Sequence, residues 1–121
     1  MSDFDFNCTG VVDKPWGYEN IFAKTDVYVG KLLFVKDGHR LSRQYHEVKM
    51  ETLCVVKGKA KFEIGEVDDM KCYVLSKGQS IHLPPNTIHR ISAHDGDVLL
   101  CEVSTPELDD VVRLHDDYNR K

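Results

Sequence analysis

Long hydrophobic runs are missing from this sequence. Its apolar stretches, such as residues 53–56, fall far short of the roughly 20 residues that a membrane-spanning helix needs. The first ten residues, MSDFDFNCTG, are acidic and lack the apolar segment of a secretory signal. We therefore predict a cytoplasmic protein that has no membrane partner.

An excess of basic residues is also missing. The chain carries a formal net charge of -4, and its Lys and Arg residues are scattered along the sequence. Binding to nucleic acid depends mainly on clustered Lys and Arg that neutralise phosphates. We therefore expect no nucleic-acid partner, although a local basic pocket for one small phosphate is compatible with this composition.

Cysteines are few and lack the paired spacing of a zinc finger. The chain has four, at positions 8, 54, 72 and 101, and no export signal that would favour disulfides. Cys54 and Cys101 stand in the apolar runs TLCVV and VLLCEV. We predict that these two are reduced core residues, with a catalytic thiol as the alternative.

Short β-prone segments separated by turn signals fill most of the chain. We predict strands over residues 28–35, 53–56, 60–64, 72–75, 80–83, 88–92 and 98–103. Turns every 8–12 residues or so are typical of an all-β sandwich or barrel, and 121 residues fit one domain, 1–121. Residues 1–13 are predicted to be flexible or to add an edge strand. The only helix candidate is 106–118, where four Asp residues disfavour a helix interior.

Two separated segments carry residues that suit a metal ion. Gln44 and His46 are two residues apart, so on a strand they point to the same side, with Ser42 behind them. Glu51 follows after a short turn and can meet His46 across neighbouring strands. Far downstream, His89 opens a strand after a proline turn. Two imidazoles, a carboxylate and an amide oxygen suit Zn, Fe, Mn or Ni and leave open positions for water or substrate.

These segments resemble the two cupin motifs. The first, G(x)5HxH(x)3-4E(x)6G, is matched in every slot except one, because Gln44 replaces the first histidine. In the second, G(x)5PxG(x)2H(x)3N, Asn86 replaces a glycine and Ala93 the final asparagine. Asn86 can still adopt the left-handed turn that glycine usually fills. The matching residues are Gly38, His46, Glu51 and Gly58, then Gly78, Pro84 and His89.

The form Q-x-H-(x)4-E is similar to the type II phosphomannose isomerase branch of the cupins. The opening segment 14–19 (KPWGYE) and the closing segment 109–120 (DDVVRLHDDYNR) also resemble that branch, with Asn119 in place of a glycine. The resemblance implies a cupin double-stranded β-helix (jelly-roll barrel) with a short helical or irregular C-terminal segment. It also implies one divalent metal held by Gln44, His46, Glu51 and His89, with zinc as the first choice.

The same resemblance implies a mannose-6-phosphate type aldose–ketose isomerase. A proton must then move between adjacent carbons, and we take Glu102 and Glu51 as the candidates for carrying it. An exposed position on the last strand is the alternative for Glu102, since its direction depends on the strand register. For the phosphate, Arg113 is the first choice, with a surface salt bridge to a nearby Asp as the alternative. Weaker phosphate candidates are Arg43, Arg90 and Lys14, and the two arginines should point away from the metal.

Other functions fit the same residues. One is a cupin that binds a sugar or other small molecule without turnover, and another is a non-haem metal-dependent oxygenase. An arginine within the pocket would favour a phosphorylated sugar as the small-molecule substrate. We also predict a homodimer in which residues 1–20 are exchanged or pair at a sheet edge.

Overall fold

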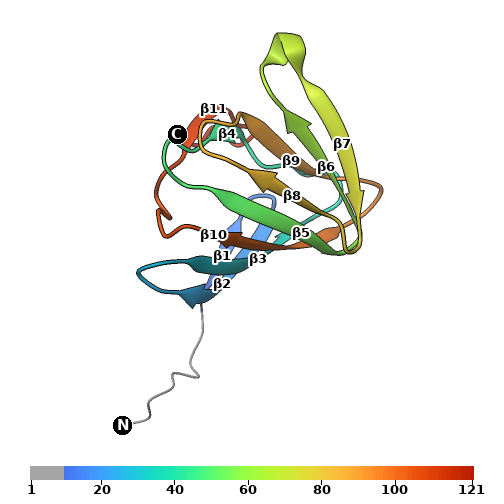
Figure 1. Ribbon diagram of the computed structural model, residues 1–121. Helices are drawn as coiled ribbons and strands as arrows, with labels where there is room; N and C mark the ends of the chain where they lie inside the picture. Colours follow the sequence, from blue (N-terminus) through green and yellow to red (C-terminus); the bar gives the residue numbers. More distant parts are fainter. Residues whose placement is uncertain (1–9) are drawn as a thin grey trace.

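Two antiparallel β-sheets face each other in the computed structural model, which describes residues 10–121 (Figure 1). Residues 1–9 lie outside the described residues. They include Cys8 and most of residues 1–13, the segment predicted to be flexible or to add an edge strand. The first sheet, sheet A, has six strands in the order β1-β2-β3-β10-β5-β8. Their bounds are Val11–Lys14 (β1), Gly17–Lys24 (β2), Val29–Val35 (β3), Val98–Ser104 (β10), Glu51–Lys57 (β5) and Ser80–Leu83 (β8).

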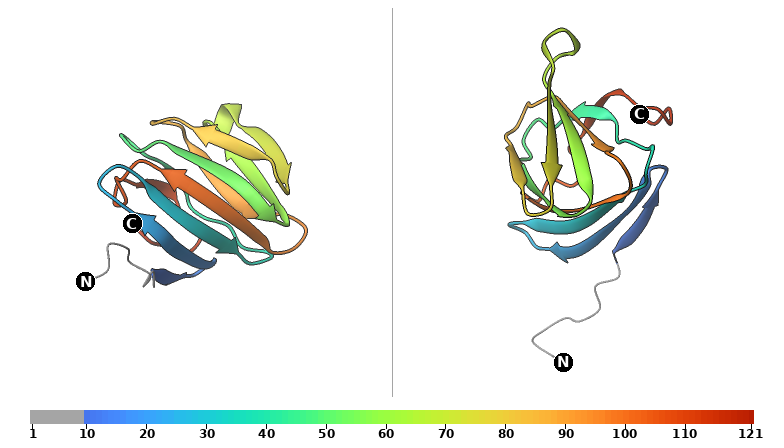
Figure 2. Two further views of the ribbon diagram at one scale, coloured as in Figure 1. Left: turned by 60° about the horizontal axis from the view of Figure 1, so that its bottom comes forward. Right: turned by 90° about the vertical axis from the view of Figure 1, so that its right-hand side faces the viewer.

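The second sheet, sheet B, has five strands in the order β11-β4-β9-β6-β7. Their bounds are Val112–His115 (β11), Arg43–Tyr45 (β4), His89–Ala93 (β9), Lys59–Ile64 (β6) and Lys71–Ser76 (β7). From β3 onward the chain passes repeatedly from one sheet to the other, which makes the barrel a jelly roll (Figures 1 and 2). A hairpin of β6 and β7 projects from the barrel and carries the short 3-10 turn η1 (Val67–Asp69) at its tip.

The predicted all-β fold and all seven predicted strands are confirmed, with shifts of one or two residues at their ends. The helical alternative for 106–118 is wrong, because this segment consists of turns and strand β11, which pairs with β4. Asp is a poor residue inside a helix, and here Asp110 and Asp117 instead accept hydrogen bonds from other segments. In residues 10–121 no helix has the length and hydropathy to cross a membrane.

An apolar core fills one half of the barrel interior. Alternate residues of β3, β5 and β10 point inward, as their alternating burial shows. Leu53 and Leu100 from sheet A meet Phe62 from sheet B, and each of these three side chains is fully buried. Burial of each such side chain stabilises the fold by about 1.5–3 kcal/mol, so this half holds the two sheets together.

The local backbone explains why Gly17 and Asn86 stand at their positions in the sequence motifs. A Cβ atom on Gly17 would lie 1.8 Å from the carbonyl oxygen of Phe34, so only glycine lets β2 begin there against β3. Asn86 has a φ of 63°, which confirms its predicted left-handed conformation. Its N–H donates to the carbonyl oxygen of His46 (2.7 Å) and so ties the proline turn to the end of β4.

Cys54 and Cys101 are not core residues, contrary to our prediction. Both are half-buried and lie between inward-pointing residues of β5 and β10, so they occupy the outer face of sheet A. Along an apolar run in a barrel strand, successive residues alternate between the inner and the outer face of the sheet. The strand register decides which of them point inward.

Candidate metal site

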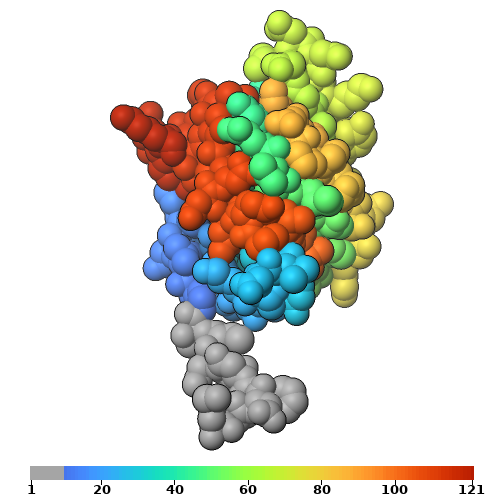
Figure 3. Space-filling view, turned by 60° about the vertical axis from the view of Figure 1, so that its left-hand side comes forward, coloured from blue at the N-terminus to red at the C-terminus, as the bar shows by residue number. Residues whose placement is uncertain are grey.

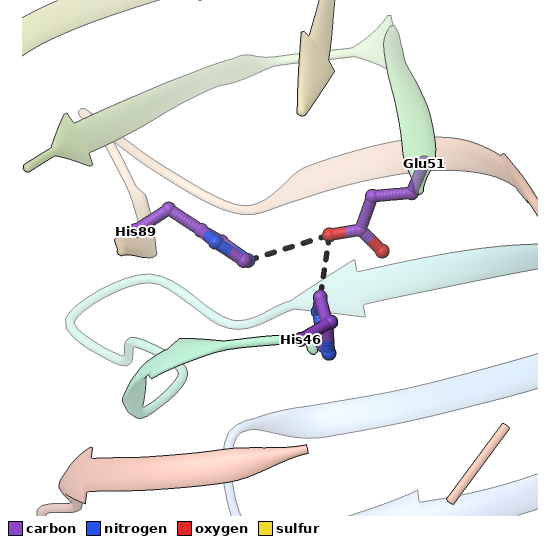
Figure 4. A group of neighbouring side chains, drawn as sticks. All are labelled: His46, Glu51 and His89. Carbon is purple, nitrogen blue, oxygen red and sulfur yellow. Dashed lines mark ion pairs between the residues drawn. The ribbon is translucent and has the colours of Figure 1, made fainter. Parts of the chain in front are cut away.

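Three side chains from three strand ends converge in the other half of the barrel interior. His46 follows β4, Glu51 opens β5 and His89 opens β9. Both imidazole Nε2 atoms face the same carboxylate oxygen, Oε1 of Glu51, at 3.4 Å from His46 and 3.3 Å from His89 (Figure 4). All three residues are buried, and their ligand-type atoms lie within 4.8 Å of one another.

Backbone carbonyls set the tautomer of both imidazoles. Nδ1 of His89 lies 2.9 Å from the carbonyl oxygen of Thr87, and Nδ1 of His46 contacts the carbonyl oxygen of Asp110. Because a carbonyl oxygen only accepts, each Nδ1 must carry the proton and donate it. In the neutral ring Nε2 is then a lone-pair acceptor, and on His89 this atom is buried with no hydrogen-bond partner.

Such a cluster needs a cation among its atoms. Two imidazole lone pairs and a carboxylate oxygen repel one another at 3.3–3.4 Å unless a proton or a metal ion lies between them. Burial raises the pKa of the Glu51 carboxyl, but the adjacent imidazoles of His46 and His89 and the charge of Lys49 lower it well below its usual range. Glu51 is therefore ionised, and the residues present fit a divalent metal of the zinc or first-row transition type.

Gln44 lies beside this cluster. On β4 it is the direct cross-strand partner of His89, and it lines a cavity of about 110 Å³ together with Ser42 and the three converging residues. One geometric expectation is corrected: His46 and Glu51 do not belong to neighbouring strands. β4 lies in sheet B and β5 in sheet A, so the two side chains meet across the barrel interior.

Asp110, from the closing segment, holds the loop between His46 and Glu51. Its carboxylate accepts backbone N–H bonds from Glu47, Val48 and Lys49 at 2.8–3.0 Å. These bonds lower the pKa of Asp110 to about 2. The carbonyl oxygen of Asp110 also orients His46, so this one residue positions both the imidazole of His46 and the loop that leads to Glu51. Figure 3 shows the red closing segment beside the green loop.

A buried ammonium group separates two carboxylates in the cavity. Lys49 Nζ lies 3.1 Å from Glu51 Oε2 and 3.2 Å from Glu102 Oε2. Burial lowers the pKa of Lys49, but the charges of Glu102 and Glu51 outweigh it and raise this pKa. Burial raises the pKa of Glu102, as does the charge of Glu51, against the opposing effect of Lys31 and Lys49.

Glu102 therefore points into the cavity, and its alternative as an exposed strand residue is wrong. Glu102 as a whole is 3% exposed, and it pairs across the strands with Lys31. Lys31 Nζ in turn lies 3.2 Å from Glu19 and 3.7 Å from Glu102. Sequence reasoning missed Lys49, Lys31 and Glu19. The sequence offered one indication for Lys49, its position two residues before Glu51. The direction of the Lys31 side chain follows only from the register of β3 against β10.

Arginines behave as two distinct groups. Arg113 and Arg120 line the cavity and also a depression formed by the closing segment. Among residues 10–121, Arg113 forms no ion pair and instead donates from Nη1 to the carbonyl oxygen of Lys121 (2.6 Å), so the salt-bridge alternative is wrong. Arg43 and Arg90 do point away from the cavity, as expected. Arg43 faces Glu63 at 4.0 Å, and the buried Arg90 binds Asp117.

The remaining histidines are absent from the cavity wall. His39 contacts the hydroxyl of Tyr118, and His82 contacts Thr52. His94 lies 3.5 Å from Asp95, and His115 faces Arg90. Trp16 is buried in the core and borders the cavity, whereas Tyr18 stacks on Phe34 outside it.

The jelly roll with a buried His/Glu/His cluster defines a cupin. A family model described as "Mannose-6-phosphate isomerase C-terminal" matches residues 5–116, and the chain belongs to that family. The sequence-based resemblance to the phosphomannose isomerase branch is thereby confirmed.

Curated relatives are larger proteins. A mannose-1-phosphate guanylyltransferase from Escherichia coli (strain K12) is 37% identical over 114 residues, which is 90% of this chain and 23% of the relative. The alginate biosynthesis protein AlgA from Pseudomonas aeruginosa is 33% identical over 114 residues, again 90% and 23%. The chain thus spans about a quarter of the length of these relatives, whose names mostly describe guanylyltransferases.

Solved structures support the same fold. KdgF from Halomonas sp. matches with a TM-score of 0.74 and 23% identity, over 89% of this chain and 97% of that one. CapF from Staphylococcus aureus matches with a TM-score of 0.76 and 23% identity, over 87% and 34%. Oxalate decarboxylase from Bacillus subtilis, which has Mn(II) centres, matches with a TM-score of 0.74 and 17% identity, over 86% and 29%.

Proposed function

We propose that this cupin is a metal-dependent sugar-phosphate isomerase that interconverts an aldose phosphate and a ketose phosphate of the mannose-6-phosphate type. The observation that carries the proposal is the convergence of two Nε2 lone pairs on one oxygen of Glu51, inside a cavity that arginine side chains border. The family's description and the mannose phosphate in its relatives' names support the same substrate class.

The proposed ligands are Gln44, His46, Glu51 and His89. Zinc is our first choice, with Fe, Mn and Ni as the alternatives that the same donor atoms suit. When bound, the metal supplies Lewis acidity that polarises the sugar carbonyl. The carbonyls of Asp110 and Thr87 would keep both imidazoles in the tautomer that can ligate.

Glu102 is the proposed proton carrier, ahead of Glu51. One oxygen of Glu51 faces the two imidazoles and the other faces Lys49, so neither is free for a substrate carbon. Glu102 lies on the same cavity wall behind Lys49, and a carboxyl with a raised pKa is better matched to taking up a proton near neutral pH. Lys49 would keep both carboxylates apart and in place.

Arg113 is the proposed phosphate anchor. It borders the cavity and the adjoining depression, so a sugar near the metal could extend its phosphate toward this guanidinium. Arg120 also lines both hollows, but Asp116 already takes its Nε and Nη2 hydrogens. Arg113 therefore has more free donor capacity for a phosphorylated substrate.

The test is to load the purified protein with Zn, Fe, Mn or Ni in turn and assay mannose, glucose and fructose phosphates. Loaded wild type should interconvert one aldose phosphate with its ketose. Glu102→Gln should reduce this rate by about 10²–10⁴-fold, the usual contribution of a general acid or base, without loss of metal. Glu63→Gln, which alters a carboxylate outside the cavity, is the matched control and should retain activity.

Other outcomes would reject the isomerase. Binding of a sugar phosphate without turnover by any loaded form would indicate a binding cupin. Oxygen consumption with Fe(II) and no isomerisation would indicate an oxygenase. Gln44→Ala and His89→Ala should each lower bound metal sharply. Full metal occupancy in both variants would show that these two residues are not ligands.

The homodimer also stays a prediction. β1 forms an outer edge of sheet A, and its residues Val11 and Val12 are exposed, which supports the proposed pairing through the N-terminal segment. Sedimentation equilibrium would distinguish a dimer from a monomer. The cytoplasmic location likewise stays a prediction.

A further inference from the structure

Two cysteines face each other on the outside of the barrel. Cys54 of β5 and Cys101 of β10 are direct cross-strand partners in an antiparallel pair. Both alternate with inward-pointing residues, Leu53 and Val55 on one strand and Leu100 and Glu102 on the other. Their side chains therefore leave the same face of sheet A at adjacent positions, and both thiols are free.

We propose that Cys54 and Cys101 form a dithiol site that low-molecular-weight disulfides convert into a cross-strand disulfide. Directly opposed residues in antiparallel strands have Cα atoms about 4.5 or 5.5 Å apart. Disulfides join Cα atoms about 4.4–6.8 Å apart, so the Cα separation of either type of pair lies in the required range. No strand has to move from its register for the bond to form.

The surroundings allow a small reagent to reach the pair. In the same row across the sheet, Leu32 lies opposite Cys101 and Ser80 lies opposite Cys54, so no charged side chain stands beside the two thiols in that row. Both cysteines keep part of their surface exposed. Burial, together with the nearby Cys54 and Glu102, raises the pKa of Cys101, so the reaction should be faster at pH 8 than at pH 7.

The chemistry is a two-step exchange with a disulfide RSSR. One protein thiolate attacks a sulfur of RSSR, which forms a mixed disulfide and releases RS⁻. The second protein thiolate then attacks the protein sulfur of that mixed disulfide and expels the second RS⁻. The two thiol protons end on the two released RSH molecules, the protein loses two electrons and RSSR gains them.

The pair differs from the other cysteine of the described residues. Cys72 lies on β7 in sheet B, opposite Glu63, and is exposed. It can take up a mixed disulfide, but within residues 10–121 no cysteine lies across the strands from it. Since β5 and β10 carry Glu51 and Glu102 on their inner faces, the new bond would join the two strands that bear the carboxylates of the cavity.

The experiment uses oxidised glutathione on folded, chelator-treated protein at pH 8, with free thiols then blocked and the protein digested for mass spectrometry. Wild type and the matched control Cys72→Ala should each yield a peptide pair joined between Cys54 and Cys101. Oxidised protein should also unfold at a higher temperature, because the bond restricts the unfolded chain. Cys54→Ala and Cys101→Ala should stop at a mixed disulfide with glutathione.

Wild type alone decides the matter if a variant fails to fold. The proposal is overturned if both thiols stay reduced, if each carries glutathione without cross-linking, or if the 54–101 peptide pair appears only after unfolding in urea. No metal or sugar takes part in this assay, so its outcome is independent of the proposed isomerase activity.

Discussion

Leu100 and Glu102 are two residues apart on the inner face of β10, and they belong to opposite halves of the barrel interior. Leu100 is fully buried among apolar side chains, whereas Glu102 is just as deeply buried among charges. β5 repeats the change with Leu53 and Glu51, and β9 with Ile91 and His89. Each strand thus contributes to an apolar half and to a polar half.

The difference separates stability from function. Apolar burial stabilises a fold directly, but buried ion pairs gain little over apolar residues of similar size because the charges lose their hydration. Stability therefore does not explain why the polar half of this barrel contains four buried charged residues, Glu51, Lys49, Glu102 and Lys31. We infer that the apolar half holds the barrel closed and the polar half is kept for binding.

The largest effect on stability should come from the apolar half. Leu100→Ala removes a fully buried side chain and should lower the free energy of unfolding by about 2–5 kcal/mol. Urea unfolding measures this loss. Metal affinity of the folded variant should change little, and a large loss of affinity in a folded variant would mean that the two halves are not separable.

An apolar replacement in the polar half should act in the opposite direction. The double variant Lys31→Met with Glu19→Leu removes one positive and one negative charge of low exposure and leaves Lys49 paired with Glu51 and Glu102. Replacing a buried ion pair by apolar residues is neutral or stabilising by about 1–4 kcal/mol. Urea unfolding of the metal-free protein tests this, and a clear destabilisation would mean that these charges support the fold.

The positioning role of Asp110 should appear in metal affinity. Asp110→Ala deletes the carboxylate that accepts three backbone N–H groups before Glu51. Loss of such an outer contact weakens metal binding by about 10–100-fold. Calorimetric titration with Zn²⁺ would measure it against Asp109→Ala, a neighbouring carboxylate outside these contacts. Equal affinity in the two variants would contradict the role.

Much of this arrangement was predictable from local patterns. Alternating residues and turn signals located the strands. The spacing of the two motifs predicted that His46, Glu51 and His89 lie close together, as they do. The direction of Glu102 was open because it depends on the register of β10 against β3, which local sequence does not determine. Asp110 was missed because it acts through backbone N–H groups some sixty residues away, which leave no pattern of side chains to detect.

The smallest predicted effect is a pH dependence outside the cavity. Asp117 accepts from Arg40 and Arg90, and the contact with Arg40 is the main cause that lowers its pKa to about 2. A depressed pKa means that the stabilisation is complete above the ordinary value near 4 and disappears as pH falls through about 2. Asp117→Asn should thus be less stable than wild type at pH 6, by about 1 kcal/mol or less for a partly exposed pair, and equal to it near pH 2.

Thermal midpoints across this pH range would measure the difference, with the exposed Asp95→Asn as the control. A difference that persists unchanged at pH 2 would show that the ionised Asp117 is not its cause.

The most direct test of the metal site is elemental analysis of protein purified without added chelator, followed by Zn²⁺ titration of the stripped protein. Wild type and the control His82→Ala, whose histidine faces Thr52 away from the cavity, should each bind close to one ion per chain. His89→Ala should bind almost none, because it lacks one of the two Nε2 donors that face Glu51. A wild type that binds no divalent ion, or a folded His89→Ala that binds as much as wild type, would contradict the account.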